Sequence, residues 1–327
     1  SQHLPAVPVR HTGRRVEAST ATTVRIGGRE LLSFAGTGYL GLSHHPEVLD
    51  AMRETLGRTG LSASASRTTS GNFAEHEHLE ESLAEFMGVE ATVILPDGWL
   101  ADEAVMEAYG DELDTVLVDA DAHASLWIST ALTRAQVIDC GSGDLMRLHA
   151  LLDRHGDHHL AVLTDGLFPM QRRMPNLHDL LQLLPRTALL VVDDSHALGF
   201  LGEGGRGSLS GAGTQDHRVV TTGSLAKALG ASGGVVDHQP GGFDLHRHVG
   251  EHELHTLVVG DRTTELLAVL GVFDRRVQCT LGDADGLRAD GRAGVVQGGQ
   301  RRLEAGAGVT DDAVARDAAV LEVQLGG

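Results

Sequence analysis

The first feature of this sequence that indicates catalytic chemistry is the side-chain amine of its only lysine. Among 26 lysine and arginine residues there is a single lysine, Lys227. An amine that attacks a carbonyl must first lose its proton, which lysine does far more readily than the guanidinium of arginine. A lysine kept in a chain that otherwise uses arginine is a candidate for covalent amine chemistry, although biased codon usage also makes lysine rare.

Three further side chains suit a cofactor that joins an aldehyde to a pyridine ring. The ring nitrogen of such an electron sink needs a carboxylate, and Asp193 is placed for that role. His123 has a flat ring that can stack on the cofactor, and His196 can hydrogen-bond its phenolic oxygen. Taken singly, Asp193 is also explained as a helix cap, and the two histidines as core or surface residues.

A phosphate group needs backbone N–H donors at the start of a helix. Gly98 and Trp99 open a predicted helix directly after an apolar run, and Ser224 adds a hydroxyl close to Lys227. A strand, a glycine and a helix in succession are weak evidence alone. Together with the amine, the acid and the histidines they predict a site for an aldehyde that carries a phosphate.

The elements that must position these residues are short apolar strands alternating with helices. The alternation predicts an α/β fold with a mostly parallel sheet covered by helices on both faces. Ligands of such sheets bind beyond the carboxyl ends of the strands, so the candidate residues meet at one edge. The predicted strands are residues 91–95, 115–118, 136–138, 160–164, 188–192 and 219–222, and the predicted helices include 75–87, 101–108 and 176–184.

Several sequence stretches resemble the α-oxoamine synthase family of fold type I pyridoxal-phosphate enzymes, within the class II aminotransferases. The resemblance is close to continuous from about Arg14 to Val236, in the family's order and near its spacing. The matching stretches are residues 39–46 (YLGLSHHP), 66–71 (SRTTSG), 76–80 (HEHLE), 121–126 (DAHASL), 164–168 (TDGLF), 192–200 (VDDSHALGF), 202–207 (GEGGRG) and 223–230 (GSLAKALG).

This resemblance implies pyridoxal 5′-phosphate as the cofactor and assigns a role to each candidate. Lys227 becomes the Schiff-base lysine, and Asp193 the partner of the pyridine nitrogen. His196 contacts the ring oxygen and His123 stacks on the ring, so these four form the catalytic set. The same four bind the cofactor together with phosphate contacts from Gly98, Trp99 and Ser224; no metal is expected.

The resemblance also implies an activity. Members condense an amino acid with an acyl thioester, carried by coenzyme A or an acyl-carrier protein, to a 2-amino ketone, usually with decarboxylation. They work as homodimers with active sites at the subunit boundary. Two alternatives remain open: another fold type I activity, such as aminotransferase, racemase or aldolase chemistry, and a relative that no longer catalyses a reaction.

The sequence departs from the family at some positions and then along a whole region. Thr37 replaces a frequent Asn, Asp97 a usual Ser or Thr beside the phosphate, and Pro169 a usual Ser. We expect an N-terminal segment at 1–45, a large cofactor domain at 46–236 and a divergent or incomplete region at 237–327. A reading-frame change in the gene and true divergence both explain that last region, whose four histidines at 246–255 have a spacing that could seat a metal.

The composition argues against several classes of partner and of cysteine chemistry. The formal net charge of −19 argues against nucleic-acid and anionic-membrane partners, which need clustered positive charge. The two cysteines form neither a metal-ligand spacing nor a disulfide framework. With no signal-peptide pattern and no long apolar run, the sequence predicts a cytoplasmic protein.

Overall fold

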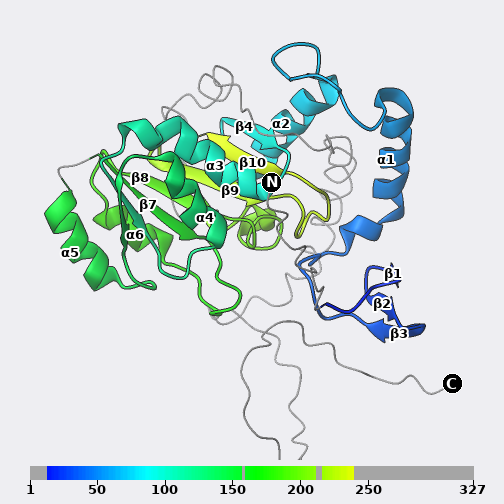
Figure 1. Ribbon diagram of the computed structural model, residues 1–327, viewed down its shortest axis with the longest axis horizontal. Coiled ribbons are helices and arrows are strands. Elements are labelled where there is room, and N and C mark those ends of the chain that lie inside the picture. The colour runs from blue at the N-terminus through cyan, green and yellow to red at the C-terminus, as the bar shows by residue number, and fades with distance from the viewer. Residues whose placement is uncertain (1–12, 157–158, 211–215, 239–327) are drawn as a thin grey trace, which may run out of the picture. The chain divides into compact units, whose positions relative to one another are not determined.

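A computed structural model describes residues 13–156, 159–210 and 216–238 (Figure 1). Within these residues the chain forms two compact units, one ending at Gly36 and one beginning at Thr37. The histidines at 246–255, and the region predicted to diverge, lie outside the described residues except for Asp237 and His238. Among the residues described, no helix has the length and hydropathy that a membrane crossing requires.

The first unit contains a small antiparallel sheet of three strands. These are β1 (Ala18–Ser19), β2 (Thr23–Ile26) and β3 (Arg29–Leu32), paired in that order. Gly27 and Gly28 both have positive φ, 59° and 73°, as the two central residues of a tight hairpin turn require. Sequence reading did not predict these short strands.

The second unit contains a larger sheet flanked by helices. Its strands are β4 (Ala91–Leu95), β5 (Thr115–Val118), β6 (Gln136–Asp139), β7 (Leu160–Asp165), β8 (Leu189–Asp193), β9 (Val219–Ser224) and β10 (Gly234–His238). Its helices are α1 (Pro46–Thr59), α2 (Ala74–Met87), α3 (Gly98–Tyr109), α4 (Ala124–Ser129), α5 (Leu145–His155) and α6 (Leu177–Leu183).

The strand order in this sheet is β4-β10-β9-β8-β7-β5-β6. The strands from β9 to β6 pair in parallel, whereas β10 runs antiparallel to both of its neighbours, β9 and β4. Two antiparallel steps leave β4 pointing the same way as β9, so the carboxyl ends of six strands share one edge. The predicted fold class, a mostly parallel α/β sheet, is confirmed.

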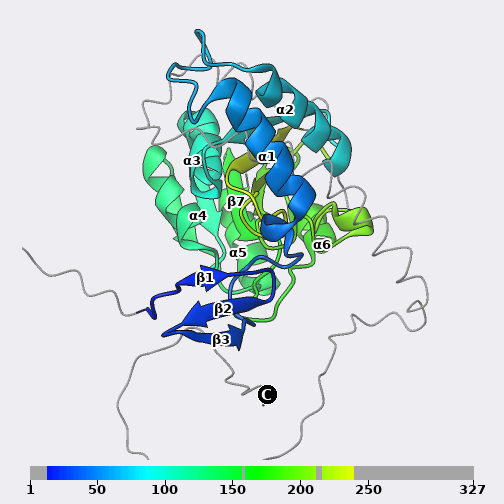
Figure 2. The ribbon, with the colours of Figure 1, turned by 90° about the vertical axis from the view of Figure 1, so that its right-hand side faces the viewer.

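Alternating side chains of each strand pack on opposite faces of the sheet. Val116 and Val118 join a buried cluster with residues of α3 and α4, whereas Leu117 joins another with residues of α5 and α6. Figure 2 shows α3 and α4 on one side of β7 and α6 on the other. A third cluster places α2 against Ile94 and Val235. The covering of both faces by helices is therefore also confirmed.

The predicted strands and helices match the observed ones to within a few residues, but β10 was missed. Only Val235 and Val236 give it an apolar character, and a glycine opens it. Pairing with β4 and β9 satisfies both edges of this short strand, and hydrophobic clusters on the two faces of the sheet bury Val235 and Val236 fully. The strand reaches His238, two residues past the predicted end of the cofactor domain.

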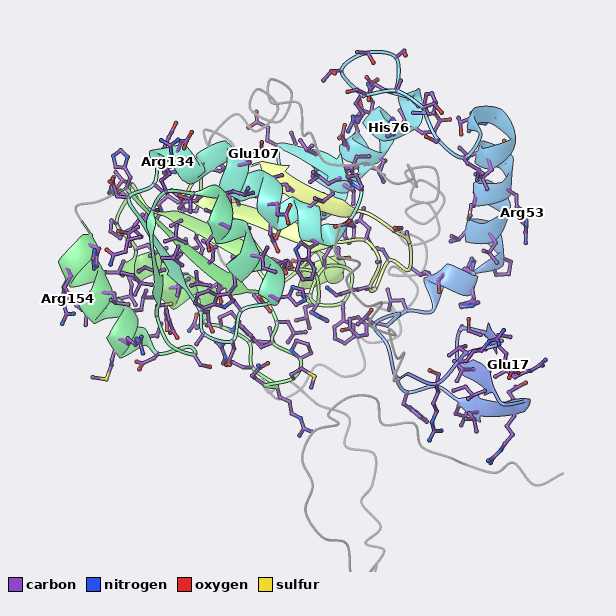
Figure 3. All side chains as sticks on the ribbon, in the orientation of Figure 1. Glu17, Arg53, His76, Glu107, Arg134 and Arg154 are labelled. Atoms are coloured by element: carbon purple, nitrogen blue, oxygen red, sulfur yellow. The ribbon has the colours of Figure 1, made fainter. Side chains whose placement is uncertain are left out.

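Local contacts hold β4 in place at the edge of the sheet. Glu80 on α2 accepts a hydrogen bond from the Ile94 N–H at 3.0 Å and forms a two-pronged pair with Arg67. The start of α2 is fixed by His76, labelled in Figure 3, whose Nδ1 accepts the Phe73 N–H at 2.8 Å. His76 is buried and performs a structural task at this helix start.

Gly234 is expected to tolerate no side chain. A Cβ added there would lie 2.2 Å from the Asp97 carbonyl oxygen and 3.0 Å from Gly98 Cα, so Gly234→Ala must push α3 away from β10. We expect it to lower the free energy of unfolding by about 1–3 kcal/mol in urea titrations. Gly57→Ala, in α1 with open space around the added atom, should instead raise it by about 0.5–1 kcal/mol. Equal free energies of unfolding for the two variants would contradict the predicted clash at Gly234.

Candidate active site

Lys227 lies in a tight turn just beyond the carboxyl end of β9. The turn is closed by backbone hydrogen bonds from Gly230 N to Lys227 O at 3.0 Å and from Ala231 N to Leu225 O at 2.9 Å. Burial lowers the pKa of Lys227 below its ordinary value, and neighbouring carboxylates oppose that shift. The only lysine of the chain is thus fixed in place and biased toward the neutral amine that carbonyl attack needs.

Three buried carboxylates surround this amine. Asp193 and Asp165 end neighbouring strands, β8 and β7, and are paired in register, while Asp102 comes from α3. Asp193 Oδ1 accepts the Ser195 N–H at 2.9 Å, and Asp102 Oδ1 accepts the Thr222 hydroxyl at 2.6 Å. All three carboxylates act electrostatically on Lys227.

Sequence reading predicted Asp193 but missed the other two acids. Burial, reinforced by Asp193, raises the pKa of Asp165 to about 7, and the same two causes raise the pKa of Asp102 well above its usual range. Asp165 directly follows a predicted strand, so the rule that selected Asp193 would have found it. Asp102 sits within a helix, and its only signal was a charged residue on an apolar helix face.

His123 caps α4 and lies beside the carboxylates. Its backbone N–H donates to Asp165 Oδ1 at 3.0 Å, and its Nδ1 lies 2.7 Å from the Ser125 hydroxyl. The ring stands edge-on to Trp99, with ring centroids 5.4 Å apart and planes at 74°. Both rings are exposed, so His123 presents an accessible surface next to the buried acids.

His196 lies in the turn that follows β8. Burial, together with the charge of Lys227, lowers the pKa of His196 to about 4, so the ring is neutral at physiological pH. Its Nδ1 lies 2.7 Å from the phenol oxygen of Tyr39, a residue that sequence reading placed in a motif but gave no role. Asp193, His123 and Lys227 all act electrostatically on this ring, which places it in the same cluster.

The start of α3 meets the end of β9. A Cβ on Gly98 would lie 2.6 Å from Ser224 Cβ, so only glycine allows this approach. The first N–H groups of any helix lack partners within it, which leaves those of Gly98 and Trp99 beside the Ser224 hydroxyl. Asp97 caps the helix by accepting the Leu100 N–H at 3.0 Å. All seven predicted site residues therefore gather at the carboxyl edge of the sheet.

Known proteins match the part of the chain that contains these site residues. The family model for aminotransferase class I and II matches residues 29–238. The 8-amino-7-oxononanoate synthase of Geotalea daltonii is 35% identical over 235 residues, which are 71% of this chain and 60% of that protein. The enzyme of the same name from Azoarcus sp. is 37% identical over 225 residues, which are 67% of this chain and 58% of that protein.

The fold matches solved structures of related enzymes. A serine palmitoyltransferase from S. paucimobilis with bound PLP is 21% identical and covers 83% of this chain and 70% of that one, with a TM-score of 0.73. At that identity the match shows the fold alone. Together the matches confirm the fold type I class and the similarity to α-oxoamine synthases. The chain spans about three fifths of the length of the curated relatives cited.

The high pKa of Asp165 predicts a pH-dependent stability of the cofactor-free protein. Folded Asp165 keeps its proton up to a pKa of about 7, whereas the unfolded chain releases it near 3.8. The contribution of this bound proton to the free energy of unfolding is fully present below pH ~4 and is lost as the pH rises through ~7. Asp165→Asn keeps the acceptor for His123 and cannot ionise. Between pH 4 and pH 8, we expect the free energy of unfolding of this variant to rise by roughly 2–4 kcal/mol relative to that of the parent, as measured by urea unfolding.

Asp216 provides a control of opposite sign. Hydrogen bonds from Arg218 lower the pKa of Asp216, so its contribution is present above the unfolded pKa and lost as the pH falls through the folded one. Asp216→Asn should therefore lose stability relative to the parent as the pH rises. The same trend in both variants would show that neither carboxyl is responsible.

Proposed function

Since the chain belongs to the aminotransferase class I and II family, we propose that it is a pyridoxal-phosphate-dependent transferase. The reaction is the decarboxylative condensation of an amino acid with an acyl thioester to give a 2-amino ketone. The observation that carries this proposal is the position of Lys227, the chain's only lysine, among three buried carboxylates at the end of β9.

The residues present fit the proposed cofactor. Its phosphate would be bound by the first N–H groups of α3, at Gly98 and Trp99, and by the Ser224 hydroxyl, which the close approach of Gly98 to Ser224 brings together. The Asp193 carboxylate, oriented by the Ser195 N–H, would pair with the pyridine nitrogen. His196 would donate to the ring oxygen, and His123 would stack on the ring.

Bound pyridoxal phosphate supplies a carbonyl that amines attack and a ring that withdraws electrons from the α-carbon of an amino acid. Lys227 would hold the cofactor through Nζ before the substrate binds. Nζ would also be the base for the proton on the substrate α-carbon, a task that suits an amine whose pKa is lowered by burial. Asp193 would keep a proton on the ring nitrogen.

The substrates and the assembly are part of the same proposal. Relatives named 8-amino-7-oxononanoate synthase support an amino acid and an acyl thioester, on coenzyme A or an acyl-carrier protein, as substrates. We place the cofactor in a domain of residues 46–236 and propose a cytoplasmic homodimer. Another fold type I activity, or loss of catalysis in a chain that spans three fifths of its relatives, remains an outcome of the tests below.

The first test is whether Lys227 holds pyridoxal phosphate. Protein purified with the cofactor and freed of excess should show a visible absorbance band, and borohydride should fix the cofactor on the peptide that contains Lys227. Lys227→Ala, as a folded control, should show neither. A parent without band or adduct would refute cofactor binding. Thiol release from acyl-coenzyme A that requires glycine, alanine or serine would then separate condensation from other activities.

Asp97 should weaken the binding of the phosphate. Its carboxylate caps the helix whose N–H groups we assign to the phosphate, and like charges a few ångströms apart repel by about 1 kcal/mol or more. Asp97→Ser keeps a helix cap without the charge, and we expect about tenfold tighter binding of pyridoxal phosphate in fluorescence titrations. Asp144→Ser, which changes the matching cap of α5, should leave the affinity unchanged. Unchanged or weaker binding by Asp97→Ser would place the phosphate elsewhere.

A further inference from the structure

Tyr39 and His196 form a hydrogen bond between two distant parts of the sequence. The phenol oxygen of Tyr39 lies 2.7 Å from His196 Nδ1, and the two ring centroids are 6.3 Å apart. Tyr39 also packs on Phe200, with ring centroids 5.2 Å apart and planes at 40°. The bond thus joins the segment just before the short helix at Leu42–His44 to the turn that follows β8.

The direction of this hydrogen bond follows from the protonation states. The ring of His196 is neutral because burial and Lys227 lower its pKa to about 4, and burial raises the pKa of the Tyr39 phenol, which keeps its proton. A phenol is a stronger donor than a neutral imidazole N–H, and an imidazole nitrogen is a stronger acceptor than a phenol oxygen. Tyr39 therefore donates to Nδ1, and the single ring proton of His196 stays on Nε2.

We propose that Tyr39 is a positioning residue that holds His196 as the Nε2–H tautomer and so makes Nε2 a donor to an anionic oxygen in the Lys227 site. This inference rests on the proposed function only for the identity of that oxygen, the ring oxygen of pyridoxal phosphate. Without Tyr39, Nδ1 would have no phenol donor, and the proton would distribute between the two ring nitrogens. In the other tautomer, Nε2 has a lone pair that repels an anionic oxygen.

The tautomer is measurable in the cofactor-free protein, independently of any activity. We would record long-range ¹H–¹⁵N spectra of histidine-labelled protein at neutral pH and assign His196 by its absence in His196→Asn. The parent should show a protonated Nε2 and an unprotonated Nδ1, and Tyr39→Phe a mixture of the two tautomers. Tyr109→Phe removes the hydroxyl of the only other tyrosine and should match the parent. An Nδ1–H signal in the parent, or an unchanged tautomer in Tyr39→Phe, would overturn the inference.

Cofactor binding gives a second readout that separates positioning from packing. Phenylalanine keeps the contact with Phe200, so Tyr39→Phe should fold normally and bind pyridoxal phosphate about 3-fold to 10-fold more weakly. In a His196→Asn background the same change should cost nothing more, because Tyr39 acts through His196. Additive losses would contradict the inference. A parent that shows the expected tautomer but binds no cofactor would refute the proposed function and leave the role of Tyr39 intact.

Discussion

The lysine site depends on one constraint, the partial burial of the Lys227 amine beside three buried carboxylates. Removing an unpaired charge from water costs far more than most folds can offset, so a buried lysine must have acids near it or lose its proton. Here Asp165 and Asp193 come from the ends of adjacent parallel strands, and Asp102 comes from the helix that covers them. The parallel sheet brings these groups to one edge, and burial then biases which of them carry protons.

The same carboxylates determine which ligand charges the site favours. Three carboxylates around one amine favour a ligand that brings a protonated ring, and burial raises the pKa of two of them, Asp102 and Asp165. The start of α3, where we propose that the phosphate binds, has a different electrostatic balance, because the helix dipole attracts an anion while the Asp97 carboxylate caps the same helix start. The two ends of the proposed cofactor would therefore meet opposite electrostatic preferences.

Many of the residues at this site could be predicted from the sequence because the ends of the strands can be located from it. Short apolar runs locate the strands, and the residues that follow each run lie at the ligand edge. This rule predicted that Asp193 and Lys227 lie at that edge, where the structure has them, and it would also have selected Asp165. Asp102 and Tyr39 escaped because their roles depend on tertiary neighbours, Thr222 and His196, that no local pattern reveals. The strand β10 escaped for a related reason: its two valines are buried by hydrophobic clusters on the two faces of the sheet, while β4 and β9 pair with its edges.

The place of β10 in the sheet also has a consequence for the order of folding. Within the described residues β4 is paired with no strand except β10, although about 140 residues of chain separate them. During synthesis, β4 and the start of α3 leave the ribosome long before β10, the last strand in chain order among the described residues of this sheet. Gly98 approaches Ser224 at the end of β9, so the proposed phosphate site also joins segments about 125 residues apart and forms late in synthesis. Until then the edge of β9 stays open to other strands, a state in which aggregation competes with folding.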